Sequence, residues 1–122
     1  MRRAIILLII CSFLGQTHVR ARETGELDFA QKLYQDRMYE LAIEQLRRFL
    51  RDRPTDPKAP AAQLLLAHCY LKAEKFEEAL HSYQDFIVSH PEDIHLPEAW
   101  KGCAQSLAFL NWPPKAAETY LR

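Results

Sequence analysis

The chain has 122 residues, and its 16 basic and 16 acidic side chains give a formal net charge of zero at pH 7. Because charges of both signs are interleaved along the sequence, nucleic acids and anionic membrane surfaces are excluded as expected partners. The length suffices for one domain with a modest core, while three glycines and three cysteines are too few for a glycine-rich phosphate loop or a disulfide framework.

Residues 1–21 have the composition of a secretory signal peptide. Two arginines precede the apolar stretch AIILLIICSFLG, which at about a dozen residues is too short to cross a bilayer as a helix. Val19 and Ala21 then supply the small residues expected before a cleavage site at Arg22. Cleavage leaves 13 basic and 16 acidic residues, a net charge of −3. The signal peptide predicts a periplasmic or secreted protein without a membrane span, and the bacterial envelope is the expected location. The alternative is that the segment is an uncleaved membrane anchor.

The rest of the chain repeats itself at an offset of 37 residues, without gaps. Three segments superpose in this register, and each has alanine at its fifth position: ELDFAQKLYQDR from Glu26, QLLLAHCYLKAE from Gln63 and WKGCAQSLAFLN from Trp100. Likewise YELAIEQLRRFLRDRP, from Tyr39, superposes on FEEALHSYQDFIVSHP, from Phe76. A third copy of that second segment begins at Pro113, Ala116, Ala117 and Tyr120. Such a period indicates a repeat architecture.

The residue pattern of each repeat predicts two helices joined by a short turn. In the second repeat, apolar residues recur at helical spacing before and after the polar pair Glu74 and Lys75. A short turn between two apolar stripes favours an antiparallel helical hairpin. Ala67 and Ala79, the latter equivalent to Ala42, are expected where the two helices lie closest. Prolines are expected only in linkers or first helical turns: Pro57, Pro60 and Pro97.

These residues resemble the tetratricopeptide repeat, a family whose motif combines small, aromatic and proline positions. The second unit carries the motif at Leu66, Ala67, Tyr70, Ala79, Tyr83 and Pro91; the third at Trp100, Ala104, Ala116 and Tyr120; the first at Phe29, Ala30, Ala42 and Pro54. The resemblance implies an all-α, right-handed solenoid over residues 22–122. Its repeats lie at about 23–56, 60–93 and 97–122, and the last is incomplete. A secreted chain of this kind is also similar to bacterial envelope repeat proteins, such as the outer-membrane assembly subunit and the Tol-Pal coordinator.

Catalytic and metal-binding patterns are not found in the sequence. It has no CxxC or HExxH spacing, and His81, His90 and His95 are expected to be solvated surface residues. Cys69 and Cys103 lie on successive first helices, where they are either buried free thiols or a disulfide. We therefore expect no enzymatic activity, no cofactor and no metal.

The resemblance implies a partner site on the concave face formed by the first helix of each repeat. The candidate residues on that face are Gln31, Tyr34, Gln35, Leu64, His68, Leu71, Lys72, Lys101, Gln105 and Phe109. For Leu64, Leu71 and Phe109, packing against a neighbouring repeat is an equal alternative. The function expected is an exported scaffold that binds a peptide or protein in this groove; the alternative is an accessory module of a longer exported enzyme or envelope assembly complex. The last copy ends without a polar cap, which predicts a longer repeat protein, a covering partner, or self-association there.

Overall fold

The computed structural model describes residues 25–110, and all the regular structure in this range is helical. Residues 25–35 form the first described helix, followed by α2 (Tyr39–Asp52), α3 (Ala59–Lys72), α4 (Phe76–Ser89) and α5 (Leu96–Phe109). The predicted signal peptide, and the third copy's second helix with Pro113, Ala116 and Tyr120, lie outside the described residues. The prediction of an all-α chain of helical hairpins is confirmed.

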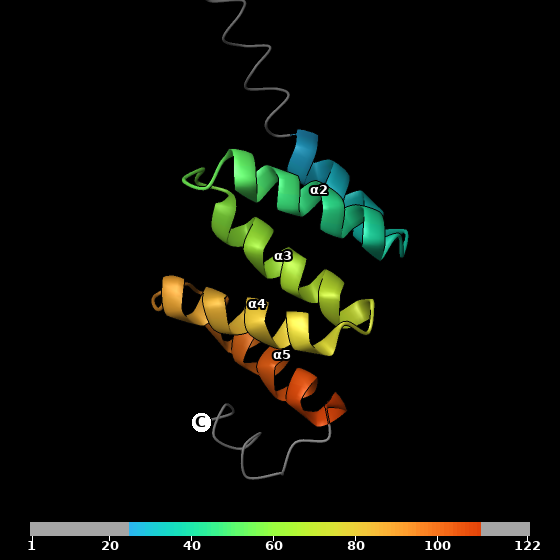
Figure 1. Cartoon of the computed structure of the whole chain (residues 1–122). Coiled ribbons are helices and arrows are strands. Elements are labelled where there is room, and N and C mark those ends of the chain that lie inside the picture. The colour runs from blue at the N-terminus through green and yellow to red at the C-terminus, as the bar shows by residue number, and fades with distance from the viewer. Residues whose placement is uncertain (1–24, 111–122) are drawn as a thin grey trace, which may run out of the picture.

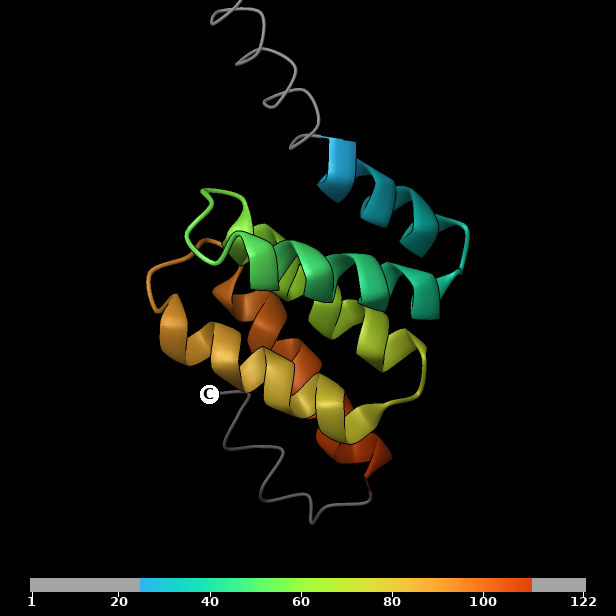
Figure 2. The ribbon, with the colours of Figure 1, turned by 45° about the horizontal axis from the view of Figure 1, so that its top comes forward.

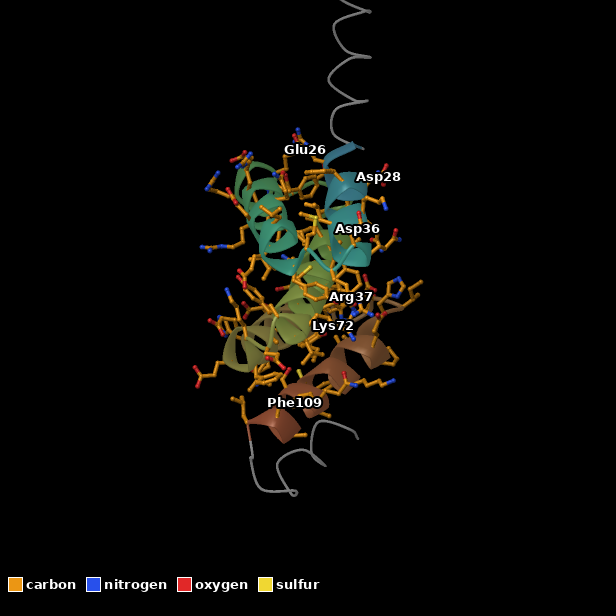
Figure 3. All side chains as sticks on the ribbon, turned by 90° about the vertical axis from the view of Figure 1, so that its right-hand side faces the viewer. Glu26, Asp28, Asp36, Arg37, Lys72 and Phe109 are labelled. Carbon is orange, nitrogen blue, oxygen red and sulfur yellow. The ribbon has the colours of Figure 1, made fainter. Side chains whose placement is uncertain are left out.

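The helices stack as hairpins along the chain (Figure 1). Residues 25–35 and α2 form the first hairpin, α3 and α4 form the second, and α5 begins a third unit. Seen from the side, α2 and α4 lie on one side of the stack, residues 25–35 and α5 lie on the other, and α3 runs between them (Figure 3). α3 packs against α2, α4 and α5, so it is the central helix of the described structure.

Two apolar clusters form the core, one on each side of α3. The first joins residues 25–35, α2 and α3 around Leu46, Phe49 and Leu65. The second joins α3, α4 and α5 around Phe86 and Leu107. Because α3 contributes to both clusters, burying its apolar residues requires a neighbour on each side, as in a solenoid.

The two hairpin turns have the same backbone geometry, 37 residues apart. Arg37 and Glu74 both adopt a left-handed conformation, with φ of 61° and 62°. The residue after each turn closes the preceding helix with a backbone bond: Met38 N–H donates to the Leu33 carbonyl at 2.8 Å, and Lys75 N–H to the Tyr70 carbonyl at 2.9 Å. The repeat seen in the sequence is thus a repeat of backbone hydrogen bonds.

The linkers between hairpins also repeat. The Asp56 and Asp93 carboxylates each accept a hydrogen bond, at 2.8 Å, from the backbone N–H two residues later. Pro60 and Pro97 then occupy the first turns of α3 and α5, where a missing N–H leaves no bond unmade. Both linkers are therefore ordered turns that orient the next helix.

Small residues allow the helices to approach closely. Ala42, Ala67 and Ala79 are fully buried, in agreement with the expected helix crossings. Gly102 of α5 faces the ring of Tyr83 from α4, and a Cβ built on this glycine would lie only 2.2 Å from the ring. The side chain of Tyr83 therefore packs directly against the backbone of α5.

Both cysteines in the described structure are buried free thiols. Cys69 belongs to the first apolar cluster and Cys103 to the second, so the two sulfur atoms face different layers. Burial raises the pKa of each thiol to about 12. Of the two alternatives for this pair, the structure has the free thiols, which behave as small apolar groups.

Candidate functional site

A groove with a volume of about 420 Å³ lies between residues 25–35 and α5, with α3 as its floor. Its lining residues come from three successive units: Gln31, Tyr34, Ala61, Leu64, Leu65, His68, His95 and Glu98. Four of the predicted site residues, from the first two units, are therefore brought together here: Gln31, Tyr34, Leu64 and His68. The floor is apolar, while the walls carry amide, phenol, imidazole and carboxylate groups.

A second hollow, of about 290 Å³, continues this groove toward the linkers. The two share Ala61, Leu64 and His95 as lining residues, and the hollow also reaches Pro57 and Ile94. The side chain of Ile94 is 87% exposed. Because they share these lining residues, the groove and the hollow form one continuous depression.

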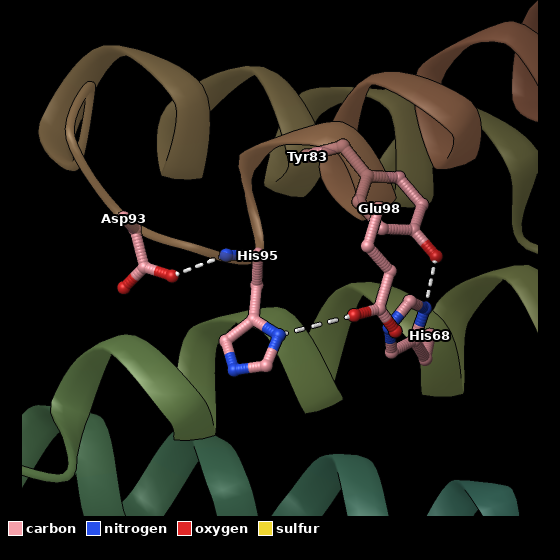
Figure 4. Close-up of polar contacts among 5 residues, drawn as sticks. All are labelled: His68, Tyr83, Asp93, His95 and Glu98. Atoms are coloured by element: carbon pink, nitrogen blue, oxygen red, sulfur yellow. Dashed lines mark hydrogen bonds and ion pairs between the residues drawn. The ribbon is translucent and has the colours of Figure 1, made fainter.

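A polar network crosses three helices at the groove wall, with His68 at its centre (Figure 4). His68 Nε2 lies 2.8 Å from Glu98 Oε1, and His68 Nδ1 is hydrogen-bonded to the hydroxyl of Tyr83. Because a carboxylate only accepts hydrogen bonds, the neutral imidazole carries its proton on Nε2. Nδ1 is then the acceptor, and the Tyr83 hydroxyl donates to it. The network links α3 to both α4 and α5.

Glu98 is shared between two histidines. Its second oxygen, Oε2, lies 3.5 Å from Nδ1 of His95, one turn earlier in the chain. The backbone N–H of His95 in turn donates to the Asp93 carboxylate at 2.8 Å. The linker before α5 thus holds His95 at the mouth of the groove, beside a carboxylate that remains about half exposed.

Burial sets the protonation state of this network. It lowers the pKa of His68, although the carboxylate of Glu98 opposes that shift by attracting the charged form; the nearby ammonium of Lys72 lowers it further. Burial also raises the pKa of Tyr83, whose side chain has no exposed surface. At neutral pH His68 is therefore a neutral imidazole with both nitrogens bonded inside the protein, and the half-exposed carboxylate of Glu98 remains available for hydrogen bonding with a ligand.

The remaining predicted site residues lie outside the lining of the groove. Gln35, Lys72, Lys101 and Gln105 are exposed, and Leu71 packs partly against the second apolar cluster. The ring of Phe109 stacks on Phe76 of α4, with centroids 4.5 Å apart and planes at 9°; Figure 3 shows it at the far end of α5. Leu64, at the groove floor, is only 6% exposed. Phe109 stays 61% exposed despite this stacking, so both alternatives stated for these residues remain predictions.

Sequence reasoning missed four lining residues: Ala61, Leu65, His95 and Glu98. Ala61 and Glu98 lie one helical turn before Leu64 and Lys101, so extending the predicted face by one turn would have found them. His95 was expected to be a solvated surface residue; its side chain is largely exposed, but it lines the groove and contacts Glu98.

Within residues 25–110 the structure has neither a metal-binding cluster nor a membrane-spanning helix. No three histidine, cysteine, aspartate or glutamate side chains in this range are placed to hold a metal ion together. None of the helices in the same range is both long enough and apolar enough to cross a membrane.

Comparison with known protein families gives one match. A sequence profile for the tetratricopeptide repeat matches residues 27–94, more than half of the chain. The matched segment contains nearly all of the first hairpin, the whole second hairpin and most of the linker before α5. No curated protein matches the chain.

Proposed function

Because the chain belongs to the tetratricopeptide-repeat family, whose repeats mediate protein–protein interaction, we propose that its groove binds an extended segment of a partner protein. The observation that supports this most is the groove itself: three units contribute to one hollow with an apolar floor and hydrogen-bonding walls. Such a combination fits a peptide, whose backbone amides need partners and whose side chains need apolar contact.

Within this proposal the predicted site residues fall into two groups. Gln31, Tyr34 and His68 line the groove and would contact the bound segment directly. The exposed residues beyond it would contact flanking parts of the partner: Gln35, Lys72, Lys101 and Gln105. His68 would act as a neutral group, held in one orientation by Tyr83 and Glu98. A preorganised wall of this kind lowers the entropic cost of binding.

We further propose that the protein acts outside the cytoplasm, after cleavage before Arg22. The proposal is supported by the basic start, the short apolar stretch, and the small residues Val19 and Ala21. Sequencing the N-terminus of the mature protein is the direct test. A protein that retains Met1 would contradict export by this route.

The groove can be tested by blocking it at its floor. Ala61 is exposed, lines both hollows and makes no polar contact, so Ala61→Arg should fill the groove without disturbing the core. The matched control is Ala108→Arg, which adds the same side chain to an exposed position of α5 outside the groove. Peptides selected from a displayed random library against the wild-type protein would serve as ligands, with fluorescence anisotropy as the measurement.

The expected result is that Ala61→Arg weakens peptide binding by at least about tenfold, while Ala108→Arg leaves it unchanged; tenfold corresponds to about 1.4 kcal/mol. Circular dichroism should show equal helicity for both variants. Selected peptides that bind Ala61→Arg as tightly as the wild type would show that the recognition surface lies elsewhere.

A further inference from the structure

A second and larger groove lies on the opposite side of α3 from the candidate binding groove. Its volume is about 1020 Å³; α2 forms one wall, α3 the floor, and Lys75 with Glu78 at the start of α4 the other wall. α2 and α4 each pack against α3 but make no contact with one another. Figure 2 shows α2 and α4 along the same face of the stack, with α3 behind them.

The floor of this groove keeps apolar surface in contact with solvent. Leu50 and Leu66 pack against the first apolar cluster but are only partly buried, as is Tyr70. Leu41, at the rim, is 47% exposed. Apolar side chains gathered in a groove of this size are typical of an interaction surface.

The wall formed by α2 carries a regular stripe of charge. Glu40, Glu44, Arg47 and Arg51 all line the groove, and their spacings of four, three and four residues place them along one face of the helix. The first half of the stripe is negative and the second half is positive. We call these four residues the α2 stripe.

The helix dipole alone does not account for this pattern. It favours acids at the start and bases at the end of any helix, and so acts alike on α2 and α4. In α4 the equivalent positions, 37 residues later, are Glu77, His81, Gln84 and Val88, and the last turn of α4 has no basic residue. The change from negative to positive along the helix is thus a property of α2 that α4, the second helix of the next repeat, does not share.

Contacts within the chain leave the α2 stripe largely available. Glu40 pairs with Lys75 at 3.0 Å, Glu44 with Arg48 at 3.3 Å, and Arg51 with Asp52 at 3.3 Å. These side chains are at least about 39% exposed, and exposed pairs contribute little to stability. Arg47 forms no ion pair with any residue in the range 25–110, so its charge is balanced only by solvent.

We propose that α2 of a second copy of this chain lies antiparallel along the α2 stripe, related by a two-fold axis. Reversing the stripe end for end places Glu40 opposite Arg51 of the second copy, and Glu44 opposite Arg47 of the second copy. The two-fold axis generates each pair twice, as in any isologous interface. A parallel arrangement would instead bring like charges together, so the sequence of signs selects the antiparallel pairing.

The dimer depends on salt, because its specificity comes from exposed charges. Raising the ionic strength from about 0.05 M to 0.5 M shortens the Debye length several-fold, and screening should weaken the dimer by roughly tenfold or more. The apolar floor at Leu50 and Tyr70 is covered in the same step, which adds a contribution that salt does not remove. Sedimentation equilibrium of the purified protein over a range of concentrations measures both effects.

Charge reversal provides the decisive test. Glu40→Lys with Glu44→Lys makes the stripe wholly positive, and Arg47→Glu with Arg51→Glu makes it wholly negative. Each variant alone should be monomeric, because like charges then face each other across the axis. An equimolar mixture of the two should form a heterodimer at low salt.

The control carries the same added charge elsewhere. Glu77→Lys with Asp85→Lys changes two exposed acids of α4 that do not line the groove. This variant should dimerise with itself like the wild type and should not pair preferentially with the wholly negative variant. A wild-type protein that stays monomeric at low salt and high concentration would overturn the proposal. So would single-sign variants that dimerise as well as the wild type, or a mixture that forms no heterodimer although both variants keep their helicity.

Discussion

Tyr83 connects the packing of the core to the polar wall of the groove. Its ring lies against Gly102 of α5, and its hydroxyl donates to His68 of α3, so one side chain of α4 fixes both neighbouring helices. The fully buried ring cannot move aside without opening the second apolar cluster. The orientation of His68 in the groove therefore depends on the close contact between Gly102 and the hydroxyl end of the Tyr83 ring.

We expect Gly102→Ala to destabilise the protein. Alanine is favoured over glycine in a helix by about 1 kcal/mol. Here the added methyl group would collide with the Tyr83 ring, and overpacking costs roughly 1 to 3 kcal/mol, or more where the neighbour cannot move. Denaturant unfolding of this variant should show a lower free energy of unfolding. Gly25→Ala is the matched control, because a Cβ there meets nothing within 4 Å; it should cause no loss.

The stability of the fold should fall at mildly acidic pH because of His68. Its pKa is lowered from 6.5 in the folded state, so the unfolded chain binds more protons below that pH. The free energy of unfolding is then greatest above about pH 6.5 and decreases as the pH drops below this value. Thermal melts between pH 7.5 and pH 5 should show a steeper decrease for the wild type than for His68→Gln. His81→Gln, at an exposed histidine that pairs with Asp85, is the matched control for loss of a histidine outside the core.

The sequence predicted Gln31, Tyr34 and His68 as neighbours because the first helix of each repeat presents the same face. It could not predict the bond between His68 and Glu98. That bond depends on the rotation between adjacent units, which is set by packing around Tyr83 and is not encoded in the spacing of either residue. Leu64 was ambiguous for a similar reason, since its burial depends on how closely α5 approaches.

Two features control helix pairing in this chain: small residues where helices cross, and linkers ordered by the hydrogen bonds of Asp56 and Asp93. Ala42 and Ala79 hold equivalent places in α2 and α4, and both have no exposed surface. The prediction of helices and hairpins from the sequence succeeded because apolar periodicity, turn residues and prolines all agree within each 37-residue unit. Helix ends were less certain, and α3 and α5 begin several residues before their first superposed segment because Pro60 and Pro97 extend them.

Enlarging the crossing alanines should loosen the hairpins. Ala42→Leu and Ala79→Leu each insert three carbon atoms where two helices touch, at an expected cost of roughly 1 to 3 kcal/mol. Ala108→Leu, at an exposed position of α5, should change the stability by less than about 0.5 kcal/mol. Urea unfolding curves provide the comparison. If leucine is tolerated equally well at all three positions, these alanines do not lie at crossings.

Loss of the hydrogen bond between the Asp93 carboxylate and the His95 N–H should affect both α5 and the groove. Asp93→Ala abolishes the bond to the His95 N–H, and a net loss of about 1 kcal/mol is typical of one hydrogen bond. Asp56→Ala removes the equivalent bond before α3 and should cost a similar amount. Only the Asp93 variant should broaden or shift the NMR signals of His95. Equal changes at His95 in both variants would show that the two linkers are not independent.

On the scale of the whole molecule, each helix packs only against near neighbours in the chain. α2 touches α3 but neither α4 nor α5, and the two apolar clusters meet only through α3. In such a structure, stability is approximately a sum of contributions from each unit and each interface. A defect in one cluster should therefore remain largely local.

Hydrogen exchange should show this locality. Leu46→Ala leaves a cavity in the first cluster and Leu107→Ala leaves one in the second, each at a cost of about 2 to 5 kcal/mol. The Leu46 variant should lose protection mainly in residues 25–52, and the Leu107 variant mainly in α4 and α5, while α3 responds to both. Uniform loss of protection from residue 25 to residue 110 in either variant would indicate a single cooperative unit instead.

Because Asp56 and Asp93 form the same hydrogen bond at equivalent places in successive linkers, residues 56–92 are a unit that could be duplicated. A duplicate of residues 56–92 inserted after residue 92 would begin and end at backbone junctions that the protein already contains. The groove would grow by one helix, yet the bond to Glu98 would not be duplicated, because Ala61 occupies the equivalent position in the inserted copy. An elongated protein would thus offer a longer ligand the same apolar floor but only one charged anchoring point, at its last unit.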